Sequence, residues 1–154
     1  MAVSRRIAIG VTGGIAAYKI ADLVSRLARE GHDVHVIMTG AASRFITPLT
    51  MKTLSGNPVL IDMFDENSPW KVQHIGIAEQ AEVLVIAPAT ANIIGKIACG
   101  IADDLLSTVV LATRAPVLVV PSMNTNMYEN PIVQENIDRL RKLGFIIMEP
   151  EAGE

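Results

Sequence analysis

The hydrophobic positions of the chain fall into short apolar runs, separated by stretches in which apolar residues recur at helical spacing. The runs predict strands over residues 7–11, 33–38, 82–87, 116–120 and 145–148, and a further short strand over 59–63. The stretches between them predict helices over residues 15–30, 41–45, 48–54, 75–80, 90–113 and 131–143. Strands that are apolar throughout and alternate with helices are typical of a parallel sheet covered on both faces. The sequence therefore predicts an α/β fold, a Rossmann-like doubly wound parallel sheet with helices on both faces in a three-layer sandwich.

Particular residues refine these boundaries. Pro88 should end the strand before it, because proline has no N–H for the strand ladder. The helix of residues 90–113 should be interrupted near Gly100, and its second half is apolar nearly all round, which indicates burial. The apolar face of the first helix is expected to consist of Ile15, Tyr18, Leu23 and Leu27.

Length and composition exclude several classes of protein. A chain of 154 residues predicts one domain, 1–154. A net charge of −3 gives no basic surface for nucleic acid, and no apolar stretch is long enough to cross a membrane. A single cysteine excludes a disulfide framework or a cysteine-based zinc site and suits a reducing compartment. The five apolar residues near the N-terminus are too short for a signal-peptide core, so we expect a cytoplasmic protein. Half of the residues are hydrophobic, which is a high share for so small a chain. We expect the excess apolar side chains to lie in subunit interfaces.

Four polar or small segments follow predicted strands, at the edge where ligands bind in such sheets: residues 12–14, 39–40, 88–92 and 121–128. The glycines of the first segment do not have dinucleotide-binding spacing, and Thr39 stands where such a site needs an acid. A mononucleotide phosphate at a helix N-terminus is the alternative, with the hydroxyls of Thr12, Thr39 and Thr90 as donors. Equally, Gly13 and Gly14 could form only a tight turn, and Thr90 only a helix cap.

Among the titratable side chains, His74 is the best acid–base candidate, although a lone histidine is more often structural. Asp103 and Asp104 are adjacent and would point apart on a helix, so helix capping or a subunit contact is the simpler role. Cys99, on a mostly apolar helix, is expected to be buried as a small hydrophobic residue.

Residues 121–128 are harder to explain as structure alone. Two asparagines and two methionines cluster there between Pro121 and Pro131. Asparagine amides can hold a carboxylate or amide without a charge, and methionines offer a polarizable wall to a flat ring or a thiol.

Four motifs carry a resemblance that covers essentially the whole chain: residues 10–19 (GVTGGIAAYK), 86–92 (IAPATAN), 100–106 (GIADDLL) and 121–127 (PSMNTNM). Together they resemble the flavin-containing cysteine decarboxylases. The nearest pattern is that of members acting on 4′-phosphopantothenoylcysteine in coenzyme A biosynthesis, often as the N-terminal half of a bifunctional enzyme. The resemblance implies FMN as cofactor, a Rossmann-like fold, and homotrimers that can assemble further into dodecamers.

Carried over by position, the resemblance implies the site residues. His74 is the implied catalytic histidine, and Asn124, with Met127 beside it, holds the substrate carboxylate. The residues implied to contact the cofactor are Gly13, Gly14, Ile15, Thr39, Thr90, Ala91, Asn92, Ile93 and Ser122. The implied chemistry is hydride removal from the carbon that bears sulfur, giving a thioaldehyde, then loss of CO2 to an enethiolate. Protonation and return of the hydride yield 4′-phosphopantetheine.

Two departures from the family pattern stand out. Tyr128 replaces the usual tryptophan, which keeps an aromatic face. The family's cysteine-bearing C-terminal flap would begin where this chain ends, so we expect a partial chain that stops at the oxidised product. Two alternatives stay open: a peptidyl-cysteine oxidative decarboxylase of the same family, and a non-catalytic FMN-binding regulatory subunit.

Overall fold

Five parallel strands form the sheet of the computed structural model, which describes residues 3–61 and 73–150. The strands are β1 (Arg6–Val11), β2 (Asp33–Met38), β3 (Val83–Ala89), β4 (Val117–Pro121) and β5 (Ile146–Ile147). Their order across the sheet is β2-β1-β3-β4-β5, and every neighbouring pair is parallel. The order reverses between β1 and β3, and this switch point is where ligands bind in open α/β sheets.

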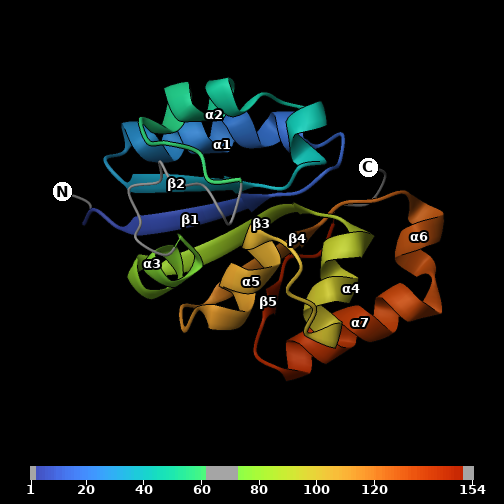
Figure 1. The fold of residues 1–154 in the computed structure, drawn as a ribbon. Helices are drawn as coiled ribbons and strands as arrows, with labels where there is room; N and C mark the ends of the chain where they lie inside the picture. Colours follow the sequence, from blue (N-terminus) through green and yellow to red (C-terminus); the bar gives the residue numbers. More distant parts are fainter. Residues whose placement is uncertain (1–2, 62–72, 151–154) are drawn as a thin grey trace.

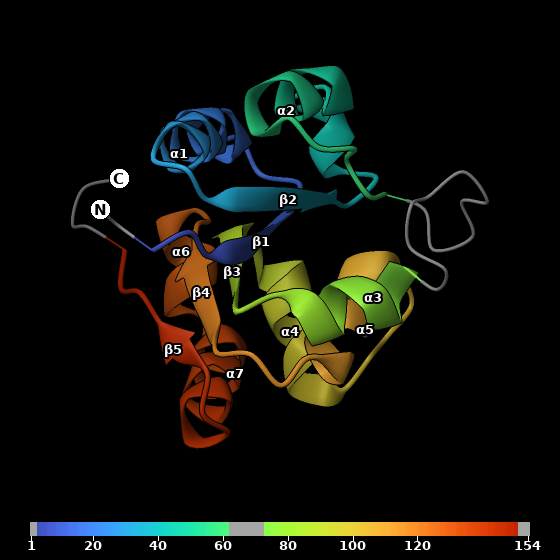
Figure 2. The ribbon, with the colours of Figure 1, turned by 90° about the vertical axis from the view of Figure 1, so that its left-hand side faces the viewer.

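Helices cover both faces of the sheet, as Figures 1 and 2 show, and the predicted doubly wound fold is confirmed. The α-helices α1 and α2 lie on one face, and α3, α4, α5 and α7 lie on the other. The helices are α1 (Ala17–Arg29), the 3-10 turn η1 (Ala42–Arg44), α2 (Pro48–Ser55), α3 (Gln73–Gln80), α4 (Ala91–Cys99), α5 (Leu105–Ala112), α6 (Thr125–Glu129) and α7 (Pro131–Lys142). Within the described ranges, no helix is long and apolar enough to cross a membrane.

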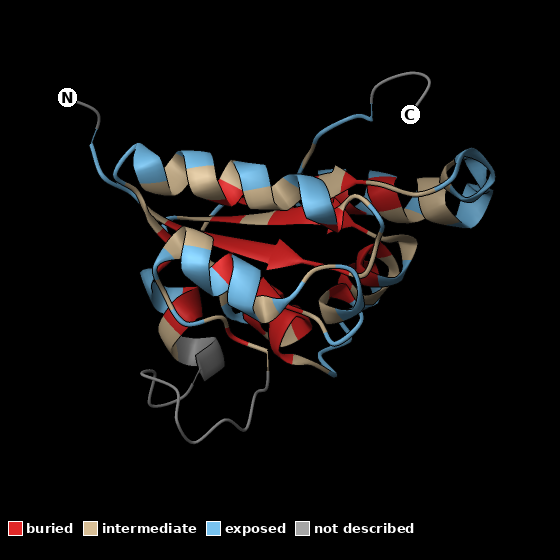
Figure 3. Cartoon of the chain, turned by 90° about the horizontal axis from the view of Figure 1, so that it is seen from above, coloured by how far each residue is buried: buried red, intermediate tan, exposed pale blue. Residues whose placement is uncertain are grey.

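The core consists of two apolar clusters, one on each face, because alternate strand residues point to opposite sides. In β1, Ile7 and Ile9 belong to the cluster beneath α1 and α2, whereas Ala8 belongs to the cluster beneath the other helices. Figure 3, seen from the side of α1 and α2, shows the strands beneath these helices as mostly buried. The apolar α5 is buried along most of its length, as predicted, although Leu111 is exposed.

Some predicted boundaries are wrong. Pro88 does not end its strand, because the ladder shifts register after Ile86 and resumes where Ala89 pairs with Pro121.

 β3 therefore ends at Ala89, two residues later than expected. Of the strand expected over residues 59–63, the described residues 59–61 form only an isolated parallel bridge, between Leu60 and Ile37, and residues 62 and 63 lie outside the described ranges. The short helix α6 was not predicted at all.

The first helix also differs from its prediction. It begins at Ala17 rather than at residue 15, and Ile15 and Tyr18 are 78% and 60% exposed. Ala17 and Val24 form its buried contacts instead, with Leu23 and Leu27 partly buried beside them. Two of the four residues of the expected apolar face are therefore available on the surface, close to the glycine loop.

Candidate functional site

The polar segments that follow β1, β2, β3 and β4 gather at the carboxyl edge of the sheet. Thr39 follows β2, and its N–H donates to the carbonyl of Val11, the last residue of β1, at 3.1 Å. Ser122 follows β4, and its N–H donates to the carbonyl of Ala89, the last residue of β3, at 3.0 Å. The fold thus brings together the polar segments that follow these strands.

The side chain of Thr12 joins the two sides of the switch point. It is only 2% exposed, and its hydroxyl donates to the carbonyl of Pro88 at 2.5 Å. The same oxygen accepts the N–H of Thr90 at 3.2 Å. Because the single hydroxyl proton is committed to Pro88, the expectation that Thr12 donates to a ligand is wrong. Thr12 instead fixes the segment that leads into α4.

Replacing Thr12 by valine is expected to lower the free energy of unfolding by about 1–3 kcal/mol, because a buried carbonyl and a buried N–H lose their partner. Thr12→Ser keeps the hydroxyl and should retain most of that stability. Urea unfolding of the two variants measures the difference. Equal stability of the valine and serine variants would contradict this role.

The two glycines after Thr12 differ in what surrounds them. A Cβ on Gly13 would lie 2.5 Å from the Cβ of Ala41, so the close packing of these loops requires glycine there. A Cβ on Gly14 would meet Pro88 and Thr90 only at 3.7 Å, which is an ordinary contact distance. The N–H of Gly14 donates to the carbonyl of Thr12 at 2.9 Å, so this loop is indeed a tight turn. It also leaves space beside Gly14.

Two further hydroxyls at this edge each accept a backbone N–H and keep a proton for a ligand. Thr39 Oγ1 accepts the N–H of Ala42 at 3.2 Å, and Thr90 Oγ1 accepts the N–H of Ile93 at 3.3 Å. The cap predicted at Thr90 is therefore confirmed. Since each hydroxyl accepts in these bonds, its O–H remains able to donate. The N-terminus of the nine-residue α4 adds the positive end of a helix dipole.

Residues of α4 and of the segment after β4 complete this edge. Ala91 is partly buried, Asn92 is exposed, and Ile93 is buried against the core. Ser122 is partly buried, and its N–H is engaged with β3, which leaves its carbonyl and hydroxyl for a ligand.

The side chain of Asn124 has a defined orientation. Its Oδ1 accepts the N–H of Met127 at 2.9 Å and so caps the N-terminus of α6. The oxygen is thereby occupied, and the two N–H groups of Nδ2 are left to donate to an acceptor such as a carboxylate. Asn124 is exposed, and Met127 beside it is 45% exposed. This orientation is compatible with an uncharged side chain that binds a carboxylate.

His74 lies in the first turn of α3, but its side chain is outside the part of the chain that the structure describes. Its catalytic role therefore remains a prediction. No cluster of metal-ligating side chains is found among the described residues.

The other titratable candidates have structural roles. Asp104 caps α5 through Ser107 in a reciprocal capping box, and Asp103 Oδ1 lies 2.9 Å from Lys96 Nζ. The hydrogen bond from Lys96 lowers the pKa of the Asp103 carboxyl, so this group stays ionised. The capping interpretation is thus confirmed. The expected burial of Cys99 is wrong, because it is exposed at the last turn of α4.

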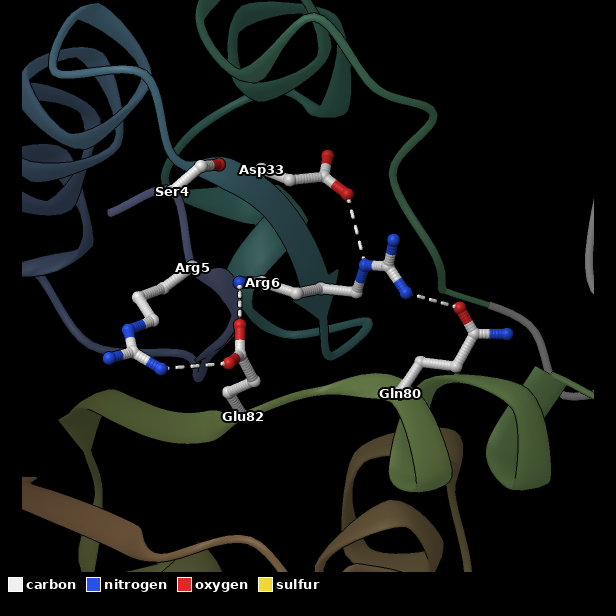
Figure 4. A pocket seen from close by; sticks show the side chains of 6 residues that line it. All are labelled: Ser4, Arg5, Arg6, Asp33, Gln80 and Glu82. Carbon is white, nitrogen blue, oxygen red and sulfur yellow. Dashed lines mark hydrogen bonds and ion pairs between the residues drawn. The ribbon is translucent and has the colours of Figure 1, made fainter. Parts of the chain in front are cut away.

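A cavity of about 290 Å³ lies at the opposite, amino edge of the sheet (Figure 4). Its charged residues pair with one another: Arg5 Nη1 lies 3.1 Å from Glu82 Oε1, and Arg6 Nε lies 3.1 Å from Asp33 Oδ2. The N–H of Arg6 and the side chain of Arg5 lower the pKa of the Glu82 carboxyl. These ion pairs connect the starts of β1, β2 and β3 at the edge opposite the carboxyl edge.

The donors at the carboxyl edge fit a mononucleotide. Thr39 and Thr90 offer hydroxyl protons, α4 offers its N-terminus, and the space beside Gly14 permits close approach to the backbone. These groups are uncharged, and they suit a phosphate monoester held by hydroxyl and N–H groups. FMN, the cofactor that the family resemblance implies, carries such a phosphate.

The Gly14→Ala variant tests this fit without disturbing the fold. The backbone of Gly14 does not have a positive φ and the new methyl group has room, so the free energy of unfolding should change by less than about 0.5 kcal/mol. The methyl would occupy the space beside the loop, and the dissociation constant for FMN, measured by flavin fluorescence, should rise by roughly tenfold or more. Gly95→Ala, whose Cβ would meet only Asn136 at 3.7 Å, is the matched control and should bind FMN normally. Normal FMN binding by Gly14→Ala would argue against a ligand at this loop.

The chain is similar to several known proteins. Residues 1–154 match the family described as Flavoprotein. The coenzyme A biosynthesis bifunctional protein CoaBC of Vibrio vulnificus (strain YJ016) is 49% identical over 150 residues, which are 97% of this chain and 37% of the relative. The chain thus spans well under half the length of that bifunctional protein. A Streptococcus mutans protein described as a "probable phosphopantothenoylcysteine decarboxylase" is 44% identical over 151 residues, 97% of this chain and 84% of that protein.

The fold of the chain is also similar to that of a solved structure. The crystal structure of the FMN-dependent cysteine decarboxylase SpaF superposes with a TM-score of 0.90 at 35% identity, covering 97% of this chain and 86% of that one.

Proposed function

The chain belongs to the Flavoprotein family, and from this premise we propose that it is an FMN-dependent decarboxylase converting 4′-phosphopantothenoylcysteine to 4′-phosphopantetheine. The observation that carries the proposal is the orientation of Asn124, whose Nδ2 donors are left for a carboxylate at the ligand-binding edge. The names of the Vibrio and Streptococcus relatives support the substrate, and the name of SpaF supports both FMN and cysteine decarboxylation.

The phosphate of FMN is assigned to the hydroxyls of Thr39 and Thr90 and to the N-terminus of α4. The remaining contacts with the cofactor are assigned to Gly13, Gly14, Ile15, Ala91, Asn92, Ile93 and Ser122. When bound there, a flavin supplies an acceptor for the hydride that leaves the carbon bearing the substrate's sulfur.

The substrate is held and prepared by residues of two other segments. Asn124 binds its carboxylate through Nδ2, and Met127 forms a polarizable wall beside the thiol. We assign to His74 the role of a base that takes up the proton of the substrate thiol. The resulting thiolate releases a hydride from the neighbouring carbon more readily than a thiol does. The negative charge left after CO2 departs is delocalised onto the same sulfur.

We also propose that the chain acts in the cytoplasm as a homotrimer, which can assemble further into a dodecamer. Support comes from large apolar side chains left exposed around the glycine loop and α2: Ile15, Tyr18, Phe45 and Leu49. Burying such residues between subunits is a common way to accommodate them.

Competition between two substrates separates this proposal from its alternatives. The FMN-loaded chain is given equal concentrations of 4′-phosphopantothenoylcysteine and a peptide with a C-terminal cysteine, and both are followed by mass spectrometry. We expect the phosphopantothenoyl compound to be decarboxylated first. Preference for the peptide would favour a peptidyl-cysteine decarboxylase, and FMN binding with turnover of neither substrate would favour a regulatory subunit.

A further inference from the structure

A hydrogen bond between a phenol and a carboxylate joins α6 to the segment that follows β5. Tyr128 Oη donates to Glu149 Oε2 at 2.7 Å, across 21 residues of sequence. The other carboxylate oxygen of Glu149 pairs with Arg141 of α7. Arg141 Nη1 also lies 3.0 Å from Asp138 Oδ1. Residues from three parts of the chain therefore meet at the carboxylate of Glu149.

Both partners of this hydrogen bond are held by other contacts. The N–H of Met148 donates to the carbonyl of Val119 at 2.9 Å, which extends the pairing of β4 with β5 up to the residue before Glu149. The ring of Tyr128 packs against the core, and its carbonyl accepts Gln134 Nε2 at 2.6 Å. Because both groups are already placed, the hydrogen bond between them orders few additional rotamers.

The orientation of α6 depends on contacts of this kind. The helix has five residues, and so short a helix has little stability of its own. Asn124 lies at its start, and the N–H of Tyr128 donates to the carbonyl of Asn124 at 3.0 Å. A displacement of Tyr128 would therefore move the residue that presents the carboxamide.

We propose that Tyr128 is a positioning residue for substrate binding: its hydrogen bond to Glu149 holds α6 so that the Nδ2 donors of Asn124 face the substrate carboxylate. This inference rests on the proposed function, in which Asn124 binds that carboxylate. Tyr128 acts through Asn124 and does not itself contact the reacting atoms.

A double-mutant cycle of Tyr128→Phe and Glu149→Ala tests the proposal, with the full chain loaded with FMN. Tyr128→Phe should raise KM for 4′-phosphopantothenoylcysteine roughly three- to tenfold and leave kcat within about twofold. Glu149→Ala should have a similar effect, and the double variant should be no worse than either single one, because all three lose the same hydrogen bond. The amide protons of residues 125–129 should exchange faster with solvent in each variant, without substrate present. Asp138→Asn, which removes only the exposed partner of Arg141, is the control and should change neither KM nor exchange.

The outcomes are distinguishable from failure of the proposed function. If the unmodified chain does not consume the substrate, the proposed function fails, and the exchange measurement alone decides whether the hydrogen bond orders α6. Unchanged exchange and KM in Tyr128→Phe, additive effects in the double variant, or a loss confined to kcat would each overturn the proposal.

Discussion

Replacing Asn124 by aspartate is expected to abolish useful substrate binding while leaving α6 intact. Aspartate caps helices as well as asparagine does, so the acceptor for the N–H of Met127 is kept. The change converts the Nδ2 donor into a second carboxylate oxygen, which repels the substrate carboxylate instead of binding it. Loss of a charge-assisted hydrogen bond together with this repulsion should lower kcat/KM by about a hundredfold or more.

The matched control for this experiment is Asn130→Asp. Asn130 caps the next helix in the same way, since its Oδ1 accepts the N–H of Ile132 at 2.9 Å, and it has no assigned contact with the substrate. We expect Asn130→Asp to retain normal kinetics. Similar kcat/KM values for Asn124→Asp and the unmodified chain would show that Asn124 does not bind the carboxylate.

Replacing His74 by asparagine is expected to leave FMN binding unchanged and to lower kcat by roughly a hundred- to ten-thousandfold, the usual contribution of a general acid–base group. Asparagine retains a polar side chain of similar reach but cannot take up a proton near neutral pH. Flavin fluorescence measures cofactor binding, and the rate of CO2 release measures turnover.

His32 provides the control for the histidine experiment. Its Nδ1 accepts the N–H of Arg5 at 3.1 Å at the amino edge of the sheet, and an asparagine oxygen can accept the same bond. His32→Asn should therefore retain activity. Activity of His74→Asn equal to that of the unmodified chain would refute the role assigned to His74.

The fold was predictable because its strands and helices differ clearly in hydrophobic pattern. Runs such as residues 7–11 are apolar throughout and require cover on both faces, and this alone indicates a parallel sheet. The end of β3 was not predictable in this way. The ladder shift that allows Pro88 to lie within the strand depends on β4, a neighbour that local sequence does not specify.

The candidate site was predictable in its location but not in its hydrogen bonding. The segments after the strands meet at one edge, as the topology requires. Whether a hydroxyl there donates to protein or to a ligand depends on its tertiary partners. Thr12 donates to Pro88, whereas Thr39 and Thr90 each accept a backbone N–H and keep their protons. The short helix α6 escaped prediction because five residues carry too little periodicity, although Asn124 followed by Met127 is compatible with a cap.

The mass of the product formed from 4′-phosphopantothenoylcysteine tests the central claim most directly. The FMN-loaded chain is incubated with this substrate and, separately, with the analogue in which serine replaces cysteine. We expect a product that has lost CO2, with or without two hydrogens, and an unchanged serine analogue, because only sulfur stabilises the charge left behind. An unchanged cysteine substrate, or equal decarboxylation of the serine analogue, would contradict it.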